Sequence, residues 1–184
     1  TDAAGNSNTC SFTVTVVDNL APVLNGVFPS GQTGMDICKA GAPAGPDEAT
    51  IAALYTDNCG TVNVIKTGAP TGDNCVWSVT YTYDVYDGHG NHVNPSPTIT
   101  FSGGDVSAPV LHGPIFGGGT NISACKSNLP SGPSLSEIAS YFTDNCGTVH
   151  VSKSASITGS DCPWSVTYTY DVYDDCGNHV SPSP

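Results

Sequence analysis

The sequence predicts an all-β protein made of tandem β-sandwich repeats, each stapled by disulfide bonds and each carrying one short helical turn. Three observations support this prediction. Long motifs return at a fixed spacing, the longest apolar segments alternate with polar residues, and eight cysteines occur in 184 residues. Small domains rich in cysteine and turn residues are typical of extracellular proteins.

The repeat defines the expected domains. The motif TDNCGTV begins at Thr56 and returns at Thr143, an offset of 87 residues (143 − 56), and WSVTYTYDVYD at Trp77 returns unchanged at Trp164. Because the offset does not slip, the copies are expected to be structural equivalents large enough to hold their own cores. We expect the last strand and linker of a preceding repeat at 1–20, a complete repeat at 21–107, and a second repeat lacking its last strand at 108–184.

Composition narrows the class of partner. Sixteen acidic residues against four basic ones give a formal net charge of −12. This balance argues against nucleic acid and against anionic membrane surfaces as partners. No apolar run has the length of a transmembrane helix, so membrane insertion is not expected.

The strands follow from period-2 patterns. In Trp77–Val85 every second residue is apolar, which predicts a strand with one buried face. Thr98–Phe101 is the expected last strand of the complete repeat, and Cys10–Val17 resembles it. Earlier strands are indicated around Val62 and Val64, and again 87 residues later.

A short helix is expected early in each repeat. Ser134 and Glu137 form a capping-box pattern, and Asp47 begins the counterpart in the first repeat. A sandwich of short alternating strands with one helical turn in a crossover is an immunoglobulin-like arrangement.

Geometry removes one pairing among the cysteines of the second repeat. Cys162 and Cys176 flank a strand about 30 Å long at about 3.3 Å per residue, whereas a disulfide needs Cα atoms within about 7 Å. Cys146 must therefore pair with Cys162 or with Cys176, and both alternatives remain open at this point.

The motifs resemble a known class of repeats. TDAAGNSNTCSFTVTVVDNLAP is similar to the closing strand and linker of a hyalin-repeat (HYR) domain. The later DNCG, C-x-W-S-V-T-Y-T-Y, D-x-C-G-N and D-x-x-A-P motifs resemble repeats of large Bacteroidetes surface adhesins of the SprB gliding type. The resemblance implies an immunoglobulin-like fold, secretion to the cell surface, and a role in adhesion, gliding motility or filament building.

The immunoglobulin-like arrangement then selects a pairing. In such folds the loop after the second strand lies beside the loop before the last strand. This implies Cys146–Cys176 and Cys125–Cys162 in the second repeat, and Cys38–Cys75 in the first. Cys59 is left unpaired because His89 stands where Cys176 stands in the second repeat, and Cys10 is expected to be unpaired or intermolecular.

Acidic and amide side chains indicate a candidate calcium site at one pole of each repeat, because carboxylate and amide oxygens are calcium-type ligands. Asx-turns are the alternative explanation. No cofactor is otherwise required. Asn121 begins a glycosylation sequon, and Trp77 and Trp164 are expected in the core rather than on a sugar-binding surface. The candidate calcium ligands are Asp57, Asp87, Asn91, Asp144, Asp174 and Asn178.

These observations favour a rigid structural or adhesive module of a long secreted surface protein or filament. The alternative is a carbohydrate- or calcium-binding accessory module of a secreted enzyme. No catalytic constellation is present in the sequence, so an enzyme is not expected. Expected partners are neighbouring repeats, a surface or glycan ligand, or further copies of the chain joined head to tail by strand addition through Cys10–Val17.

Overall fold

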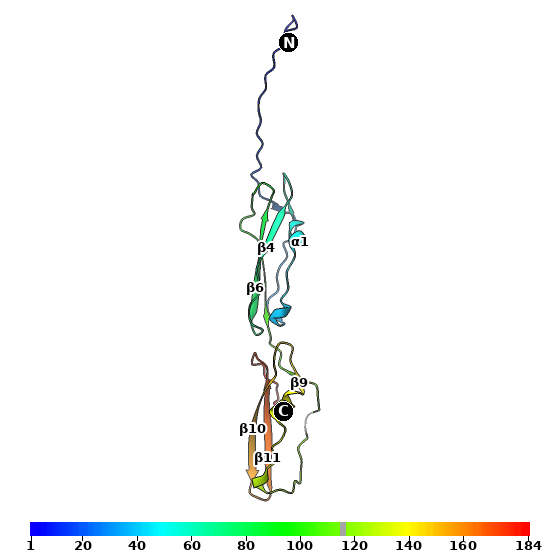
Figure 1. The fold of residues 1–184 in the computed structure, drawn as a ribbon, viewed down its shortest axis with the longest axis vertical. Helices are drawn as coiled ribbons and strands as arrows, with labels where there is room; N and C mark the ends of the chain where they lie inside the picture. The colour runs from blue at the N-terminus through cyan, green and yellow to red at the C-terminus, as the bar shows by residue number, and fades with distance from the viewer. Residues whose placement is uncertain (115–116) are drawn as a thin grey trace. The chain divides into compact units, whose positions relative to one another are not determined.

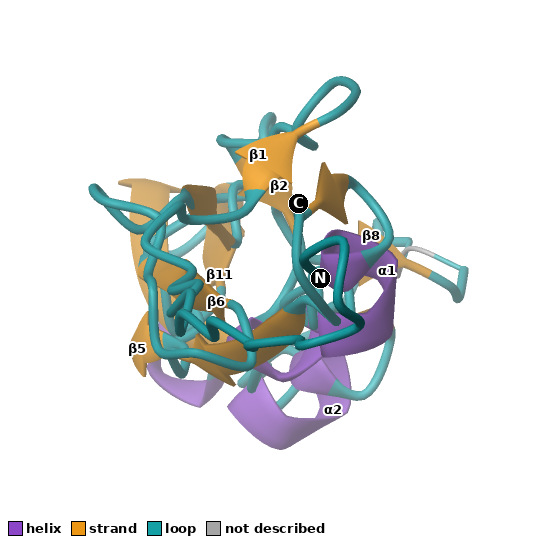
Figure 2. Ribbon diagram, turned by 90° about the horizontal axis from the view of Figure 1, so that it is seen from above, coloured by secondary structure: helices purple, strands orange, loops and turns teal. Residues whose placement is uncertain are grey.

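The computed structural model describes residues 1–114 and 117–184. Strands and loops make up most of it, and the helices are short (Figures 1 and 2). The chain divides into two compact units. The first contains Thr1–Phe28, Pro46–Lys66 and Thr82–Pro97, and the second contains Pro29–Gly45, Thr67–Tyr81 and Thr98–Pro184.

The order of elements repeats with the offset seen in the sequence. Each element of the first repeat that has a counterpart begins 87 residues before it, as β6 (Trp77–Tyr86) precedes β11 (Trp164–Tyr173). The domain boundaries expected at 20, 107 and 184 stay a prediction. The other matching pairs are β1 (Val23–Leu24) and β8 (Val110–Leu111), η1 (Lys39–Gly41) and η2 (Lys126–Asn128), α1 (Glu48–Ala52) and α2 (Leu135–Ala139), β3 (Tyr55–Thr56) and β9 (Phe142–Thr143), and β4 (Asn63–Thr67) and β10 (His150–Gly159).

Strand β6 confirms the predicted alternation. Its odd-numbered residues from Trp77 to Val85 are all buried, and the side chains between them are exposed or half-buried. The strand lies in a five-stranded sheet of order β2 (Met35–Asp36), β7 (Thr98–Gly104), β6 and β4, with β5 (Thr71–Gly72) also paired to β6. Burying one face of so regular a strand supplies the apolar area that holds the sheet.

The first unit packs around Tyr83. Its ring meets Phe28 edge-on with centroids 6.1 Å apart, and its hydroxyl donates to the Pro46 carbonyl over 3.0 Å. Pro46 stands just before α1, whose first turn is capped by the Asp47 carboxylate accepting from Thr50 N at 2.7 Å. The predicted helix start at Asp47 is thus confirmed, and its Ile51 is fully buried.

The second unit contains a long hairpin with a core cluster beside it. Strands β10 and β11 pair antiparallel from His150–Tyr173 to Gly159–Trp164 (Figure 1). The predicted capping box at Ser134 is present, with the Ser134 hydroxyl accepting from Glu137 N and the Glu137 carboxylate accepting from Ser134 N. Helix α2 contacts β9 and β10, and its Ile138 belongs to a core cluster with Phe142, Tyr170 and Val172.

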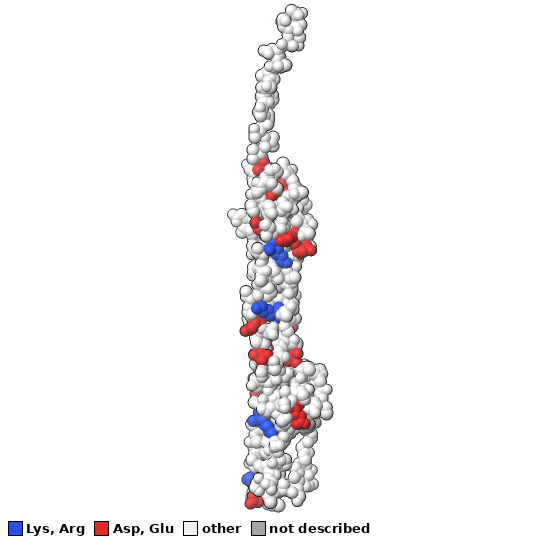
Figure 3. Space-filling model, viewed as in Figure 1, with Lys and Arg blue, Asp and Glu red and all other residues white. Residues whose placement is uncertain are grey.

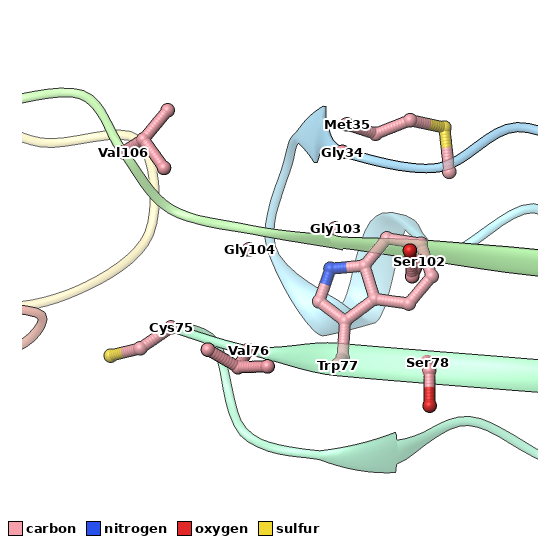
Figure 4. A pocket seen from close by; sticks show the side chains of 10 residues that line it. All are labelled: Gly34, Met35, Cys75, Val76, Trp77, Ser78, Ser102, Gly103, Gly104 and Val106. Atoms are coloured by element: carbon pink, nitrogen blue, oxygen red, sulfur yellow. The ribbon is translucent and has the colours of Figure 1, made fainter.

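Two glycines let β7 run against its neighbours. A Cβ atom on Gly103 would overlap the Met35 carbonyl oxygen and lie 2.8 Å from the Trp77 ring, and one on Gly104 would overlap the Cys75 carbonyl oxygen. Figure 4 shows this region, where the Trp77 indole extends from β6 across β7 at Gly103, beside an open hollow of about 280 Å³. Only glycine therefore fits at these two positions, which are the last two residues of β7.

The segment Cys10–Val17 differs from the expected strand. It forms no strand in the structure and runs as an extended stretch before β1 (Figure 1). Phe12, Val14 and Val16 are 86%, 70% and 84% exposed, whereas Ile99, the counterpart of Phe12, is 1% exposed in β7. The difference has a simple cause, since β7 is sandwiched between β2 and β6 while no described strand lies beside Cys10–Val17.

We expect Gly104→Ala to destabilise the fold by about 1–3 kcal/mol, because its Cβ would force the Cys75 backbone away from β7. Thermal and urea unfolding followed by circular dichroism would measure the change. Gly88→Ala is the matched control, since a Cβ on Gly88 meets no atom within 4 Å. Equal stability of the two variants would contradict the close approach described for β7.

Candidate functional site: a disulfide joint and two acidic sites

Two disulfide bonds connect the first sequence repeat to the second. Cys38 bonds Cys146 and Cys75 bonds Cys176, each with Cα atoms 5.2 Å apart. All four residues belong to the second compact unit. We call these two bonds and the loops that carry them the joint.

The joint corrects the pairings expected within each repeat. Cys38 does not bond Cys75, Cys146 does not bond Cys176, and Cys125 and Cys162 are free and exposed. Cys162 and Cys176 are not bonded to each other, as the length of the strand between them predicted. The expected pairings were wrong because they joined cysteines of one repeat only. Instead, the loops that carry Cys38 and Cys75 in the first repeat are each bonded to a cysteine of the second repeat. Cys10 and Cys59 are free and exposed as well.

Hydrogen bonds reinforce the joint. Asn74, beside Cys75, donates its amide to the Cys146 carbonyl over 3.0 Å, and its own carbonyl accepts from Asp105 N over 2.9 Å. The linker that leaves β7 is held at a second point by Asp36, whose carboxylate accepts from Val106 N at 3.1 Å and from the Ser107 hydroxyl at 2.5 Å. The joint thus consists of two disulfide bonds with hydrogen bonds around them.

The D-x-x-G-N motif forms the same closed turn in three places. The Asp174 carboxylate accepts from the backbone N–H of Cys176 at 2.7 Å and of Asn178 at 2.9 Å. The side-chain amide of Asn178 also donates to this carboxylate, over 2.7 Å. Asp87 is held in the same way by Asn91 and the His89 backbone, and Asp2 by Asn6 and the Ala4 backbone. These bonds are the Asx-turns that were the alternative to calcium ligation.

The turns also set the charge of their aspartates. Burial on its own would raise the pKa of Asp87, but hydrogen bonds from Asn91, His89 and Gly90 lower that pKa to about 2. Asp174 is similar: burial raises its pKa, and the hydrogen bonds from Asn178 and Cys176 bring it below the usual value. Both carboxylates therefore stay ionised although they are 1% and 2% exposed.

A second aspartate lies beside each turn and comes from the D-x-x-A-P linker. Asp105 is 4% exposed, its backbone carbonyl accepts from the Asn178 amide over 3.2 Å, and one carboxylate oxygen accepts from Ser107 N at 3.1 Å. Burial raises its pKa, and the nearby charges of Asp144, Asp174 and Asp36 raise it further. A buried carboxylate surrounded by others is electrostatically unsatisfied.

Four buried carboxylate oxygens accept no hydrogen bond from the described residues. They are Asp18 Oδ2, Asp57 Oδ1, Asp105 Oδ2 and Asp144 Oδ2. They form two sets related by the 87-residue offset. We call Asp18, Asp57 and Asp87 the first acidic site, and Asp105, Asp144 and Asp174 the second.

The sequence anticipated part of these sites. Asp57, Asp87, Asp144 and Asp174 lie in the loops expected, while Asn91 and Asn178 direct their amides to the aspartates of their own turns and to the linker carbonyls. Asp18 and Asp105 were missed as site residues. The signal was available, because the linker aspartate recurs at the same offset as the loop aspartates.

Other singled-out residues have ordinary roles. Trp77 is 1% exposed and donates its indole N–H to the Ile37 carbonyl at 2.8 Å, and the half-buried Trp164 donates to Ala124 at 2.9 Å, so the predicted core position of Trp77 is confirmed. His92 binds Asp84 at 2.7 Å and stacks on Tyr86. Asn121 is exposed at positive φ, and its glycosylation stays a prediction.

Charged groups are sparse on the face drawn in Figure 3, where the lysines appear as separate spots rather than a basic patch. In the part of the chain that the structure describes, no helix is both long enough and apolar enough to cross a bilayer. Comparison with protein-family models, curated proteins and solved structures gives no match.

Non-reducing peptide mapping should recover Cys38–Cys146 and Cys75–Cys176, with four cysteines open to alkylation. Removing one bond with Cys38→Ser and Cys146→Ser together should lower the free energy of unfolding by about 2–5 kcal/mol, because each bond closes a loop of about 100 residues. Cys59→Ser, at a free and exposed position, should leave it unchanged. Recovery of a Cys38–Cys75 peptide would refute the joint.

Proposed function

We propose that this chain is a structural module of a long extracellular protein, in which immunoglobulin-like repeats joined in pairs by disulfide bonds form a stiff, tension-bearing spacer. The observation that carries the proposal is the joint: both disulfides connect consecutive repeats instead of stapling each repeat to itself. Disulfides fit the oxidising conditions outside the cell. A cell-surface location and a role in adhesion or gliding rest on the resemblance to surface-adhesin repeats.

A double covalent joint suits a spacer for a mechanical reason. A single peptide linker transmits force but allows bending and twisting, whereas two bonds carried by separate loops resist both. The distance between Cys38 and Cys75 along the sequence places the bonds on different loops, before η1 and before β6. Hydrogen bonds of Asn74 and Asp36 to the linker and the facing loop oppose the same motions.

The repeat extends the proposal to neighbouring units. Cys125 and Cys162 are the counterparts of Cys38 and Cys75, and both are free and exposed. A following repeat with cysteines in its TDNCG and D-x-C-G-N loops would complete the same pair of bonds. Cys59 is the counterpart of Cys146 and would bond a preceding repeat, where His89 allows only one bond in place of two.

Strand addition from another copy of the chain receives less support. Cys10–Val17 would take the place that β7 has beside β6, but it carries Val16 and Val17 where β7 has Gly103 and Gly104. Side chains at those two positions would overlap the backbone of Met35 and Cys75. A neighbouring repeat whose closing strand keeps these glycines is the better partner.

Stretching single molecules from their two ends tests the mechanical role. With the joint intact, the shortest covalent path bypasses the sequence separation of 108 between Cys38 and Cys146. Reduction should therefore lengthen the fully extended molecule by about 380 Å, at about 3.5 Å per residue. The Cys59→Ser variant should lengthen equally. A contour length that reduction leaves unchanged would contradict the proposal.

Extending the chain after Pro184 by a second copy of residues 98–184 tests the neighbour rule. Because Pro184 matches Pro97, this addition continues the repeat in phase. We expect two new bonds, from Cys125 to the added Cys146 and from Cys162 to the added Cys176, found by non-reducing peptide mapping. Replacing the added Cys176 by His, the residue found at His89, should prevent the bond of Cys162 and leave the bond of Cys125 in place. A Cys125–Cys162 bond in the extended chain would refute the rule.

A further inference from the structure

Each of the two acidic sites contains buried carboxylate oxygens that accept no hydrogen bond from the described residues. At each site one linker aspartate and one TDNCG aspartate bury a carboxylate oxygen that accepts no hydrogen bond. In the second site the residue Asp105 is 4% exposed, and in the first the side chain of Asp18 is 3% exposed. Leaving such groups charged and unpaired in a protein interior is costly.

The oxygens of the second site converge. Single ligand atoms of Asp105, Asp174 and Cys176 lie within 4.8 Å of one another, and those of Asp18, Asp87 and His89 do the same at the first site. Cys176 is bonded to Cys75, so its sulfur is no thiolate, and the converging groups with negative charge are carboxylates. Asp144 adds a further buried oxygen in the loop that carries Cys146.

No lysine of the protein is committed to these oxygens. The chain has four basic residues, all of them lysines, and each donates to a backbone carbonyl elsewhere. The lysine bonds run from Lys39 to Gly72, from Lys66 to Pro46, from Lys126 to Gly159, and from Lys153 to Ser131 and Pro133. At the second site no described basic side chain faces the carboxylates, so a cation from solution would balance their charge.

We propose that each acidic site binds a calcium ion, with Asp105, Asp144 and Asp174 as ligands at the second site and Asp18, Asp57 and Asp87 at the first. The linker aspartates are the residues that complete the sites. At the second site Asp105 brings a third carboxylate to two loops that already meet, since Thr148 N donates to the Asp175 carboxylate over 2.9 Å. The inference is independent of the disulfide joint and adds a metal-binding function to the proposed spacer.

Calcium fits this donor set better than other common cations. All the offered charged ligands are carboxylate oxygens from three separate segments, and calcium accepts six to eight oxygens in flexible geometry, completing its shell with water and carbonyls. Magnesium demands a near-ideal octahedron and gives up water reluctantly, and transition metals favour nitrogen and sulfur ligands. The Asx-turn of Asp174 holds its carboxylate in place beforehand, which lowers the ordering cost of binding.

The two sites differ in one respect. His89 Nδ1 lies 3.4 Å from Asp18 Oδ2 in the first site, whereas the second site has the disulfide-bonded Cys176 in that position. The His89 ring therefore occupies space from which a cation would approach Asp18 Oδ2. We therefore expect the first site to bind calcium more weakly than the second. The His89→Ala variant should bring the calcium dissociation constants of the two sites closer together.

Calorimetric titration of the chelator-stripped full chain with calcium chloride alone tests the proposal. We expect two bound ions, with dissociation constants of about 10⁻⁴ to 10⁻³ M, the range of extracellular calcium modules. Asp105→Asn should reduce the number to one, and Asp18→Asn with Asp105→Asn should abolish binding. Asp161→Asn, an exposed loop aspartate, is the control and should keep both ions.

Thermal unfolding separates metal binding from a purely structural role of the aspartates. In chelator, Asp105→Asn should be as stable as the natural chain or more stable, because it removes a buried unpaired charge without changing shape. In 10 mM calcium the natural chain should gain melting temperature and the double variant should not. A natural chain that binds no calcium at 10 mM and shows no thermal shift would overturn the proposal and assign a shared proton to the oxygens.

Discussion

The close contact between β7 and the start of β6 determines where the whole joint lies. Gly103 and Gly104 let the β7 backbone touch the backbone of Met35 and Cys75, and Asp105 N then donates to Asn74 at 2.9 Å. From this one contact Cys75 is aimed at Cys176, Asn74 reaches Cys146, and the linker aspartate enters the second acidic site. Side chains at the two glycines would separate all of these groups together.

A chain of this composition needs stabilising bonds in addition to its apolar core. Only 38% of its residues are hydrophobic, and several strands have two residues. A small domain buries a modest fraction of its surface, so its apolar core contributes little surplus over the entropy of folding. The cores around Tyr83 and around Ile138 are correspondingly small, and the joint adds stability that they do not supply.

The sequence was sufficient for features that depend on local pattern. Alternation located β6 because a strand with one buried face must place Trp77, Val79 and Tyr81 on the same side. The capping pattern located α2 because Ser134 and Glu137 satisfy each other's backbone donors within one turn. The 87-residue offset predicted that every such element would recur.

The sequence did not predict the features that depend on contacts between repeats. Pairing Cys38 with Cys146 requires knowing that two loops of different repeats meet, and no periodicity within one repeat records that. Cys10–Val17 has the pattern of a strand, but a pattern forms a strand only where a partner offers hydrogen bonds. The linker aspartates look like turn residues until Asp105 is seen buried beside Asp174.

The interlocked order of the two disulfides has a consequence for damage by proteases. Cys38 precedes Cys75, and their partners Cys146 and Cys176 follow in the same order. A single cut at any peptide bond between Cys38 and Cys176 therefore leaves both halves attached through at least one sulfur bridge. Such a molecule could be nicked in its exposed loops by enzymes in its surroundings and still not come apart.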